Sequence, residues 1–235
     1  LMDLGALDQL DSKGAECIIC TEDRGKGVIE SAINQLLLSD RVKVISYNGI
    51  NNAGSAVAIK AMCDLLPQSP KIVIHRDRDF LTEAEVLKWG ADYISRDMTI
   101  FSPPLCDVET YHCSIEQVAK VYEISKQKAE ELVEKAFSET LEELKTKFRE
   151  KRREAIQKFW RDGGGPTTQE LWGDDQTLNW NNIYGKGFIK TLNKLLPESL
   201  GVQRKNLQVS ASADFRDLIR DKLSSLGITF ELQGI

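Results

Sequence analysis

The sequence predicts an α/β fold in which a mainly parallel sheet is flanked by helices, with a helical insertion and C-terminal helices. Over residues 15–112, short apolar segments rich in β-branched residues alternate with segments that have helical spacing of apolar residues. Such alternation is typical of parallel strands joined by helices that cover both faces of the sheet. Over residues 114–161 the strand signals stop and helical patterns take over.

The individual elements follow from local signals. The expected strands are AECIICTED (15–23), RVKVISYNG (41–49) and KIVIHRDRD (71–79), and DMTIFSPPL (97–105) is a fourth short strand or an extended piece. The expected helices between them cover 27–38, 55–66 and 81–90. An Asn-Gly turn signal closes the second strand. Thr82 and Glu85 match a capping box at the start of the third helix, and Gly90 matches a helix stop.

The change of pattern divides the chain into three parts. We expect a core domain over residues 10–113, a helical insertion over 114–162, and a C-terminal part over 163–235 that completes the core domain. Within the insertion, Ser125 and Ser138 have the residue type of helix caps.

The bulk composition is that of a globular protein. With 235 residues, of which 41% are hydrophobic and 29% charged, the chain is long enough to bury a sizeable core. No apolar stretch approaches the roughly 18 residues of a membrane helix and no signal peptide is visible, so we expect a cytoplasmic protein without membrane contact. The net charge of −5 argues mildly against nucleic acid as a partner, although bound divalent cations invert a locally acidic field.

The cysteines predict free thiols. Their odd number, 5, in a chain with no visible export signal favours a reducing compartment. Cys17 and Cys20 have C-x-x-C spacing, but they lie in an apolar strand-like run, which favours buried and inert side chains. With His75 and His112 as its histidines, the chain is not expected to form a Cys/His zinc site.

Acidic residues gather where the predicted strands end. Glu22 lies at the end of the first strand, Asp77 and Asp79 lie at the end of the third, and Asp107 and Glu109 follow the fourth. Ligands bind beyond the carboxyl ends of the strands in open α/β sheets, and residues two apart on an extended chain point to the same side. Carboxylates this close repel one another unless a cation lies between them, and Mg²⁺ or Mn²⁺ prefers such oxygen ligands. The pattern therefore predicts a divalent-metal site.

Neighbouring charges leave alternatives open. Glu83 lies in the first turn of the third helix and fits a metal ligand and a helix-end residue equally well. For Glu85 the cap is the better interpretation. Arg76 and Arg78 are expected to face outward as partners of the carboxylates or of a phosphate.

These motifs together resemble the TOPRIM domain, and within that group the chain is most similar to the OLD-family ATPase-nucleases. The matching segments are ECIICTED, SYNGINNAGSA, IVIHRDRDF, PPLCDVETYHC and IYGKGFIKTL, spread over residues 10–235. The resemblance places Glu22 at the family's first glutamate, Glu109 at the second acid of the proline-led segment, and Lys186 at a catalytic lysine. The first motif departs from the family's E-G-x-x-D, because Lys26 stands at the position of the second acid. Asp23 as a substitute ligand and Lys26 as a phosphate contact both remain open.

The resemblance implies a divalent-metal-dependent endonuclease with two Mg²⁺ or Mn²⁺ ions, which clamp the attacking and leaving oxygens of a phosphodiester. It implies Glu22, Asp77, Asp79 and Lys186 as catalytic residues. The expected metal ligands are Glu22, Asp77, Asp79, Glu83, Asp107 and Glu109. The expected substrate is DNA, with RNA left open.

The resemblance also implies partners. OLD-type proteins carry an ABC-type ATPase domain, and many relatives act in bacterial defence against phage. We also expect this chain to form an oligomer. This chain contains no P-loop of the form G-x-x-x-x-G-K-[ST] and begins at Leu1, so we expect a C-terminal fragment whose ATPase domain or subunit lies outside it.

A basic run is the other candidate for nucleic-acid binding. We expect Lys26, Arg76, Arg78, Lys151, Arg152 and Arg153 to contact the phosphate backbone. The last three belong to a basic run over 145–161, and the glutamates in and next to that run (Glu142, Glu143, Glu150 and Glu154) favour the alternative of an ordinary solvated helix with Glu–Lys pairs. Two further hypotheses for the whole chain are a non-catalytic scaffold that binds an ATPase or toxin partner, and a nucleotidyl or phosphoryl transferase.

Overall fold

The described part of the chain comprises most of the sequence. The computed structural model describes residues 14–23, 25–173 and 178–230. The first residues of the predicted core domain (10–13) and the last of the predicted C-terminal part (231–235) lie outside this range.

The described residues form two compact units, which we name by their content. The sheet unit contains the residues before Asp77, together with Gly90–Ser102 and the residues from Arg216 on. The helical unit contains Asp77–Trp89 and Pro103–Phe215. The helices of the predicted insertion thus share a unit with segments that precede and follow them in the chain.

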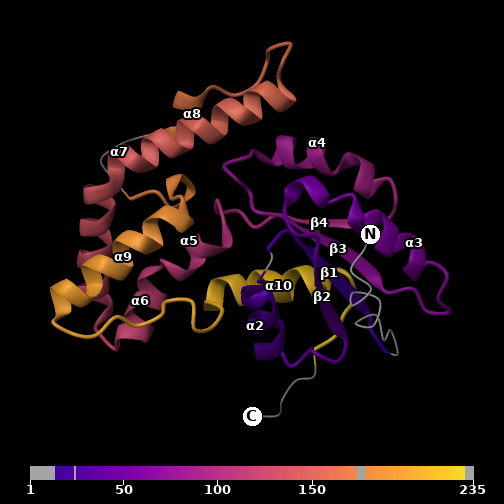
Figure 1. Ribbon diagram of the computed structural model, residues 1–235, viewed down its shortest axis with the longest axis horizontal. Helices are drawn as coiled ribbons and strands as arrows, with labels where there is room; N and C mark the ends of the chain where they lie inside the picture. The colour runs from indigo at the N-terminus through magenta and orange to yellow at the C-terminus, as the bar shows by residue number, and fades with distance from the viewer. Residues whose placement is uncertain (1–13, 24, 174–177, 231–235) are drawn as a thin grey trace. The chain divides into compact units, whose positions relative to one another are not determined.

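The sheet confirms the predicted α/β fold. Within the described residues, four parallel strands pair in the order β2-β1-β3-β4 (Figure 1). They are β1 (Cys17–Thr21), β2 (Val42–Ser46), β3 (Lys71–His75) and β4 (Thr99–Phe101). β1 has a neighbour on each side and is buried along its whole length, which explains its continuous apolar run. The register pairs Thr21 with Ser46 and with His75, so these strand ends are level.

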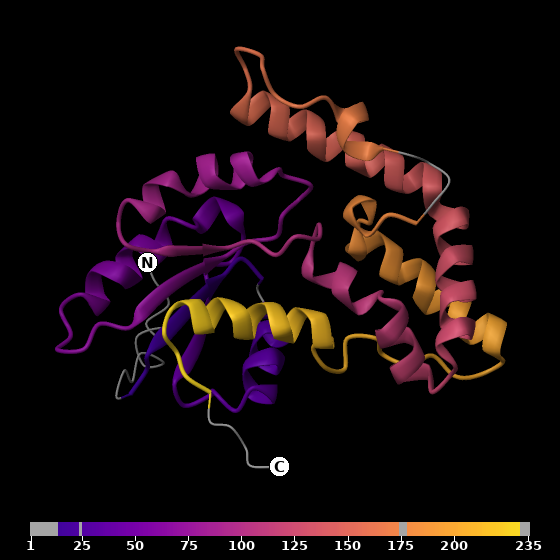
Figure 2. The same cartoon turned by 180° about the vertical axis from the view of Figure 1, so that it is seen from behind.

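Helices cover both faces of this sheet. They are α2 (Gly27–Gln35), α3 (Ser55–Cys63), the end of α4 (Glu83–Ile94) and most of α10 (Ala213–Ser225). α3 and the end of α4 lie on one face, and α2 and α10 lie on the other (Figure 2). Right-handed crossovers require this arrangement, because the chain moves one way from β1 to β2 and then back across the sheet to β3 and β4.

Gly90 does not end a helix as predicted. α4 continues through it to Ile94. A Cβ atom at Gly90 would lie 2.6 Å from the Cγ1 atom of Ile100 in β4. The glycine is therefore explained by close packing of the helix against the strand, and not by a helix end.

The cysteines confirm the prediction of free thiols. All five are buried and unbridged. Burial raises the pKa of Cys17 and Cys20 to about 12, so both thiols stay protonated at neutral pH.

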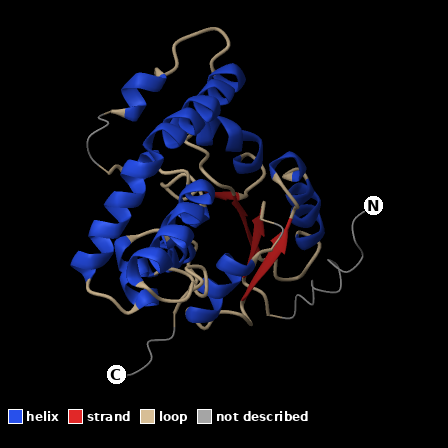
Figure 3. Ribbon diagram, turned by 60° about the vertical axis from the view of Figure 1, so that its left-hand side comes forward, coloured by secondary structure: helices blue, strands red, loops and turns tan. Residues whose placement is uncertain are grey.

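The helical unit is built around one long helix. Its main helices are α5 (Val108–His112), α6 (Ile115–Tyr122), α7 (Lys126–Phe159), α8 (Thr168–Trp172) and α9 (Gly185–Leu200). The strands all belong to the other unit, whereas helices and loops make up this one (Figure 3). Buried side chains such as Phe137, Phe148, Phe188 and Leu192 join α7 and α9 in a common apolar core.

The ends of α7 test the predicted caps. Ser125 caps the helix, because its side chain accepts a hydrogen bond from the backbone N–H of Lys128. Ser138, the other predicted cap, lies inside the helix and donates to the carbonyl of Glu134.

Among the described residues, no helix is both long and apolar enough to cross a membrane.

Candidate functional site

The acids of the D-x-D motif belong to the helical unit, where Asp77 meets the start of α9. Asp77 is buried, with 3% of its surface exposed. One of its carboxylate oxygens accepts a hydrogen bond from the backbone N–H of Val108 at 3.3 Å. The other lies 2.7 Å from the Nζ atom of Lys186, so a lysine that is distant in sequence neutralises this buried acid.

Asp107 holds the same lysine from a second side. It caps α5, where its Oδ1 atom accepts hydrogen bonds from the backbone N–H and the hydroxyl of Thr110 at 2.9 and 2.7 Å. Its Oδ2 atom accepts from the backbone N–H of Lys186 at 3.1 Å. The first turn of α9 is thus bound through both the backbone and the side chain of Lys186 to two buried carboxylates.

Gly185 makes this approach possible, and sequence reasoning did not single it out. A Cβ atom at this position would lie 2.1 Å from the backbone nitrogen of Thr110 and 2.2 Å from Oδ1 of Asp107. Any larger residue would therefore push α9 away from α5. The signal available in the sequence was the glycine directly before the predicted lysine.

Burial and neighbouring charges shift the pKa values of the acids and the lysine in this group. Burial, reinforced by the neighbouring Asp77, raises the pKa of Asp107 to about 6. Burial, with Asp107 and Asp77, raises the pKa of Glu109 to about 7. Burial disfavours the charged form of Lys186, but the attraction of Asp77, Glu109 and Asp107 outweighs it and raises the lysine pKa. Burial is thus the main cause of the two raised carboxylate pKa values, and repulsion between the carboxylates adds to it.

Asp79, the second acid of the motif, is paired differently. Its Oδ1 atom lies 3.0 Å from the Nζ atom of Lys151 in α7. Its backbone N–H donates to the carbonyl of Cys106 at 2.8 Å. Both Asp79 and Phe80 have left-handed backbones, with φ of +51° and +60°. A bulky residue rarely adopts such a conformation, so the segment is held there by its surroundings.

Glu83 and Arg78 pair with each other. The Arg78 guanidinium lies 3.1 Å from a carboxylate oxygen of Glu83 and donates to the carbonyl of Pro103 at 2.9 Å. The Glu83 side chain is 70% exposed at the first turn of α4. Its carboxylate thus faces solvent and Arg78. This arrangement favours the interpretation of Glu83 as a helix-end residue over that of a metal ligand.

The prediction of an exposed, phosphate-binding side chain is wrong for two arginines. Arg152 is fully buried and binds Glu85 through two hydrogen bonds of 2.6 and 3.0 Å, so it has no surface to offer a phosphate. Arg76 was expected to face outward, yet only 4% of it is exposed. Arg153, by contrast, is exposed on α7.

The first-motif residues lie in the sheet unit. Glu22 directly follows β1 and is half-buried. Lys26 occupies the position before α2, with a left-handed backbone at φ +46°. The structure thus brings Asp77, Asp107, Glu109 and Lys186 together in one unit, while Glu22 and Lys26 belong to the other.

The donor atoms decide which cofactor the group could hold. Asp77, Asp107 and Glu109 supply oxygen atoms only, which suits Mg²⁺ or Mn²⁺, and their mutual repulsion would be relieved by a cation. As the side chains are placed, however, the described residues contain no group of three or more His, Cys, Asp or Glu that could hold a metal ion. The chemistry of the donors therefore fits a divalent cation, while in this arrangement the Lys186 ammonium neutralises Asp77.

Comparisons with known proteins do not assign the chain to a family. No family model, no curated protein and no solved structure matches the chain. The similarity to the TOPRIM domain of OLD-family nucleases thus stays a prediction from sequence motifs.

Proposed function

We propose that this chain is a divalent-metal-dependent endonuclease of the TOPRIM type that cleaves phosphodiester bonds in DNA. The observation that carries the proposal is the binding of Lys186 by Asp77 at 2.7 Å and by Asp107 at 3.1 Å, beside Glu109. A buried group of ionisable residues with shifted pKa values is typical of a functional site. An acid-rich group with one positioned lysine suits the handling of a phosphate diester.

The residues take distinct roles in this proposal. Asp77, Asp107 and Glu109 would hold a cation, and the motif resemblance implies Asp79 and Glu22 as further metal ligands. A divalent cation bound there supplies a Lewis acid for the phosphoryl group. The Lys186 side chain is 40% exposed, so its ammonium is in a position to leave Asp77 and stabilise the negative charge that develops on a phosphate.

The wider setting follows from the motif resemblance. It supports an ABC-type ATPase domain or subunit as partner, an oligomeric assembly, and a role in anti-phage defence in the bacterial cytoplasm. RNA remains a second possible substrate, because nothing in the acid group discriminates between the two sugars.

Plasmid nicking tests the proposal. We expect cutting of supercoiled DNA by the full chain with Mg²⁺ or Mn²⁺ and none with EDTA. Asp77→Asn and Lys186→Met should each reduce the rate by about 100-fold or more, the size expected for loss of a group that stabilises the transition state. Lys190→Met, which changes an exposed lysine one turn further along α9, is the matched control and should cut normally. Equal cutting by all variants would rule out this site.

A non-catalytic scaffold is the second candidate. It is favoured by the ion pairs Lys186–Asp77 and Lys151–Asp79, which neutralise both acids of the motif without a metal. Calorimetry separates the two hypotheses. Heat of Mn²⁺ binding that is lost in Asp77→Asn supports the nuclease, whereas no binding and no cutting by the wild-type chain supports the scaffold.

A further inference from the structure

The segment that carries the D-x-D motif has a strained backbone. Asp79 and Phe80 are consecutive non-glycine residues in the left-handed region, at φ +51° and +60°. Such a conformation persists when contacts around it over-determine it.

Three residues of α7 supply them. Phe148 packs against Phe80, with ring centroids 4.7 Å apart. Lys151 places its Nζ atom 3.0 Å from the carboxylate of Asp79. Arg152 donates to the carbonyl oxygen of Phe80 at 3.0 Å. Within little more than one helical turn, α7 thus contacts the ring, the backbone and the neighbouring carboxylate of the strained pair.

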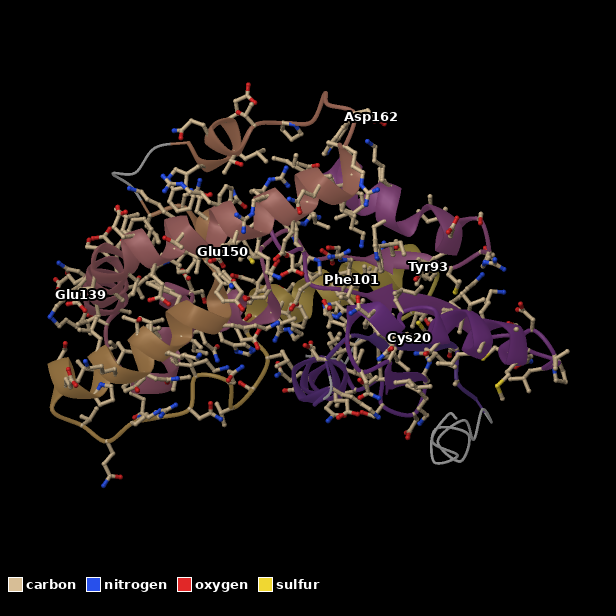
Figure 4. The ribbon with its side chains drawn as sticks, turned by 45° about the horizontal axis from the view of Figure 1, so that its top comes forward. Cys20, Tyr93, Phe101, Glu139, Glu150 and Asp162 are labelled. Atoms are coloured by element: carbon tan, nitrogen blue, oxygen red, sulfur yellow. The ribbon has the colours of Figure 1, made fainter. Side chains whose placement is uncertain are left out.

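Lys151 differs from three other lysines of α7 in the position of its partner. Lys128, Lys145 and Lys147 form ion pairs with glutamates three residues away on the same helix. Such pairs are ordinary for an exposed helix whose surface is rich in charge, as seen around Glu139 and Glu150 (Figure 4). Lys151 instead pairs with Asp79, and both side chains are about three-quarters buried, at 25% and 27% exposure.

We propose that α7 positions Asp79 of the D-x-D motif, with Lys151 as its positioning residue and with Phe148 and Arg152 fixing the backbone of Phe80. The helix predicted as an insertion is then a part of the site and not an appended module. The effect on cutting rests on the proposed nuclease function, whereas the effect on the segment does not.

The experiment compares Lys151→Met with Lys128→Met in the full chain. Lys128 is the matched control because it lies on the same helix and forms an ion pair of 2.9 Å, but with Glu131 of that helix. Hydrogen exchange of the amides of residues 79–81 is measured in EDTA, and nicking is measured with Mn²⁺. Lys151→Arg serves as the conservative variant that keeps the charge.

We expect exchange at residues 79–81 to accelerate by up to about fivefold in Lys151→Met, the range that a partly buried ion pair supports. Nicking should fall by about 100-fold, since small displacements of a catalytic group have effects of this size. Lys151→Arg should recover most of both properties, and Lys128→Met should match the wild type.

Two results would overturn the proposal, and a third would overturn the nuclease function alone. Equal exchange in Lys151→Met and Lys128→Met would overturn the proposal. Faster exchange with normal nicking would also overturn it, because Lys151 would then be a structural contact without influence on Asp79. If the wild-type chain does not nick DNA, the nuclease function fails, while the exchange comparison still decides whether α7 holds the segment.

Discussion

Two buried carboxylates of the helical unit, Glu85 and Asp107, have opposite electrostatic surroundings. Glu85 is fully buried, yet its pKa is lowered, because hydrogen bonds from Arg152, Thr82 and Trp160 outweigh the effect of burial. Asp107 is 2% exposed and its pKa is raised to about 6, because burial and Asp77 outweigh its hydrogen bonds. A buried charge costs free energy unless it is fully compensated.

The difference separates a group that is compensated by its own contacts from one that is not. The Glu85 cluster contains its own counter-charge and four donors, so it needs nothing else. The Asp107 cluster retains an excess of negative charge, which a cation from outside would relieve. Perturbed pKa values of this kind are typical of functional sites, which is why the proposed function is placed at Asp107 and not at Glu85.

Arg152→Met should have the largest effect on stability. It leaves the Glu85 carboxylate buried without its counter-ion and removes the bond to the Phe80 carbonyl. Loss of one partner of a buried ion pair costs about 3–5 kcal/mol, which urea unfolding would measure. Arg153→Met, the exposed neighbour, should change stability by less than about 0.5 kcal/mol. Similar small effects for both variants would mean that Glu85 is not compensated by Arg152.

The pH dependence of stability should reveal the other cluster. The pKa of Asp107 is raised from 3.8 to about 6, so its contribution is fully present below 3.8 and is lost as the pH rises through 6. In EDTA, the wild type should lose about 2 kcal/mol or more between pH 4 and 7 relative to Asp107→Asn, because Asp107 also helps to raise the pKa of Glu109 and the two contributions have the same sign. Asparagine keeps the helix cap and cannot ionise. Taking the difference also cancels His112, whose pKa burial lowers to about 4 and whose contribution has the opposite sign. Parallel stability curves would show that Asp107 carries no unbalanced charge.

The sequence predicted the parts of this molecule that depend on local pattern. Strand–helix alternation predicted the parallel sheet, and the Thr82–Glu85 capping box is present, with reciprocal hydrogen bonds of 2.8 and 3.3 Å. The acids after the third and fourth strands were also visible as motifs. Local spacing is sufficient for such features because neighbouring residues make the interactions.

Contacts between distant segments could not be predicted in the same way. Arg152 looked like one more charge on a solvated helix, and its burial depends on a partner in another segment. One clue was its position four residues after Phe148 and three before Ala155, both of which face the core. Likewise, the need for glycine at position 185 follows from the approach of α9 to Asp107, which has no local signature.

Trp160→Phe should have the smallest effect and sharpens the comparison most. It removes the indole N–H that donates to Glu85 at 2.7 Å and keeps an aromatic ring next to Lys88. Three donors remain, two from Arg152 and one from Thr82, so we expect a loss of about 1–2 kcal/mol in urea unfolding.

A double-mutant cycle with Glu85→Gln assigns that loss to the hydrogen bond. If the indole stabilises the ionised carboxylate, Trp160→Phe should be less destabilising in the Glu85→Gln background than in the wild type, because a neutral acceptor binds the indole more weakly. An equal loss in both backgrounds would place the effect in ring packing, for which the approach of Lys88 to the Trp160 ring at 3.2 Å is the nearest cause. Glu85 would then be compensated by the remaining donors without the indole, and its contrast with Asp107 would depend on Arg152.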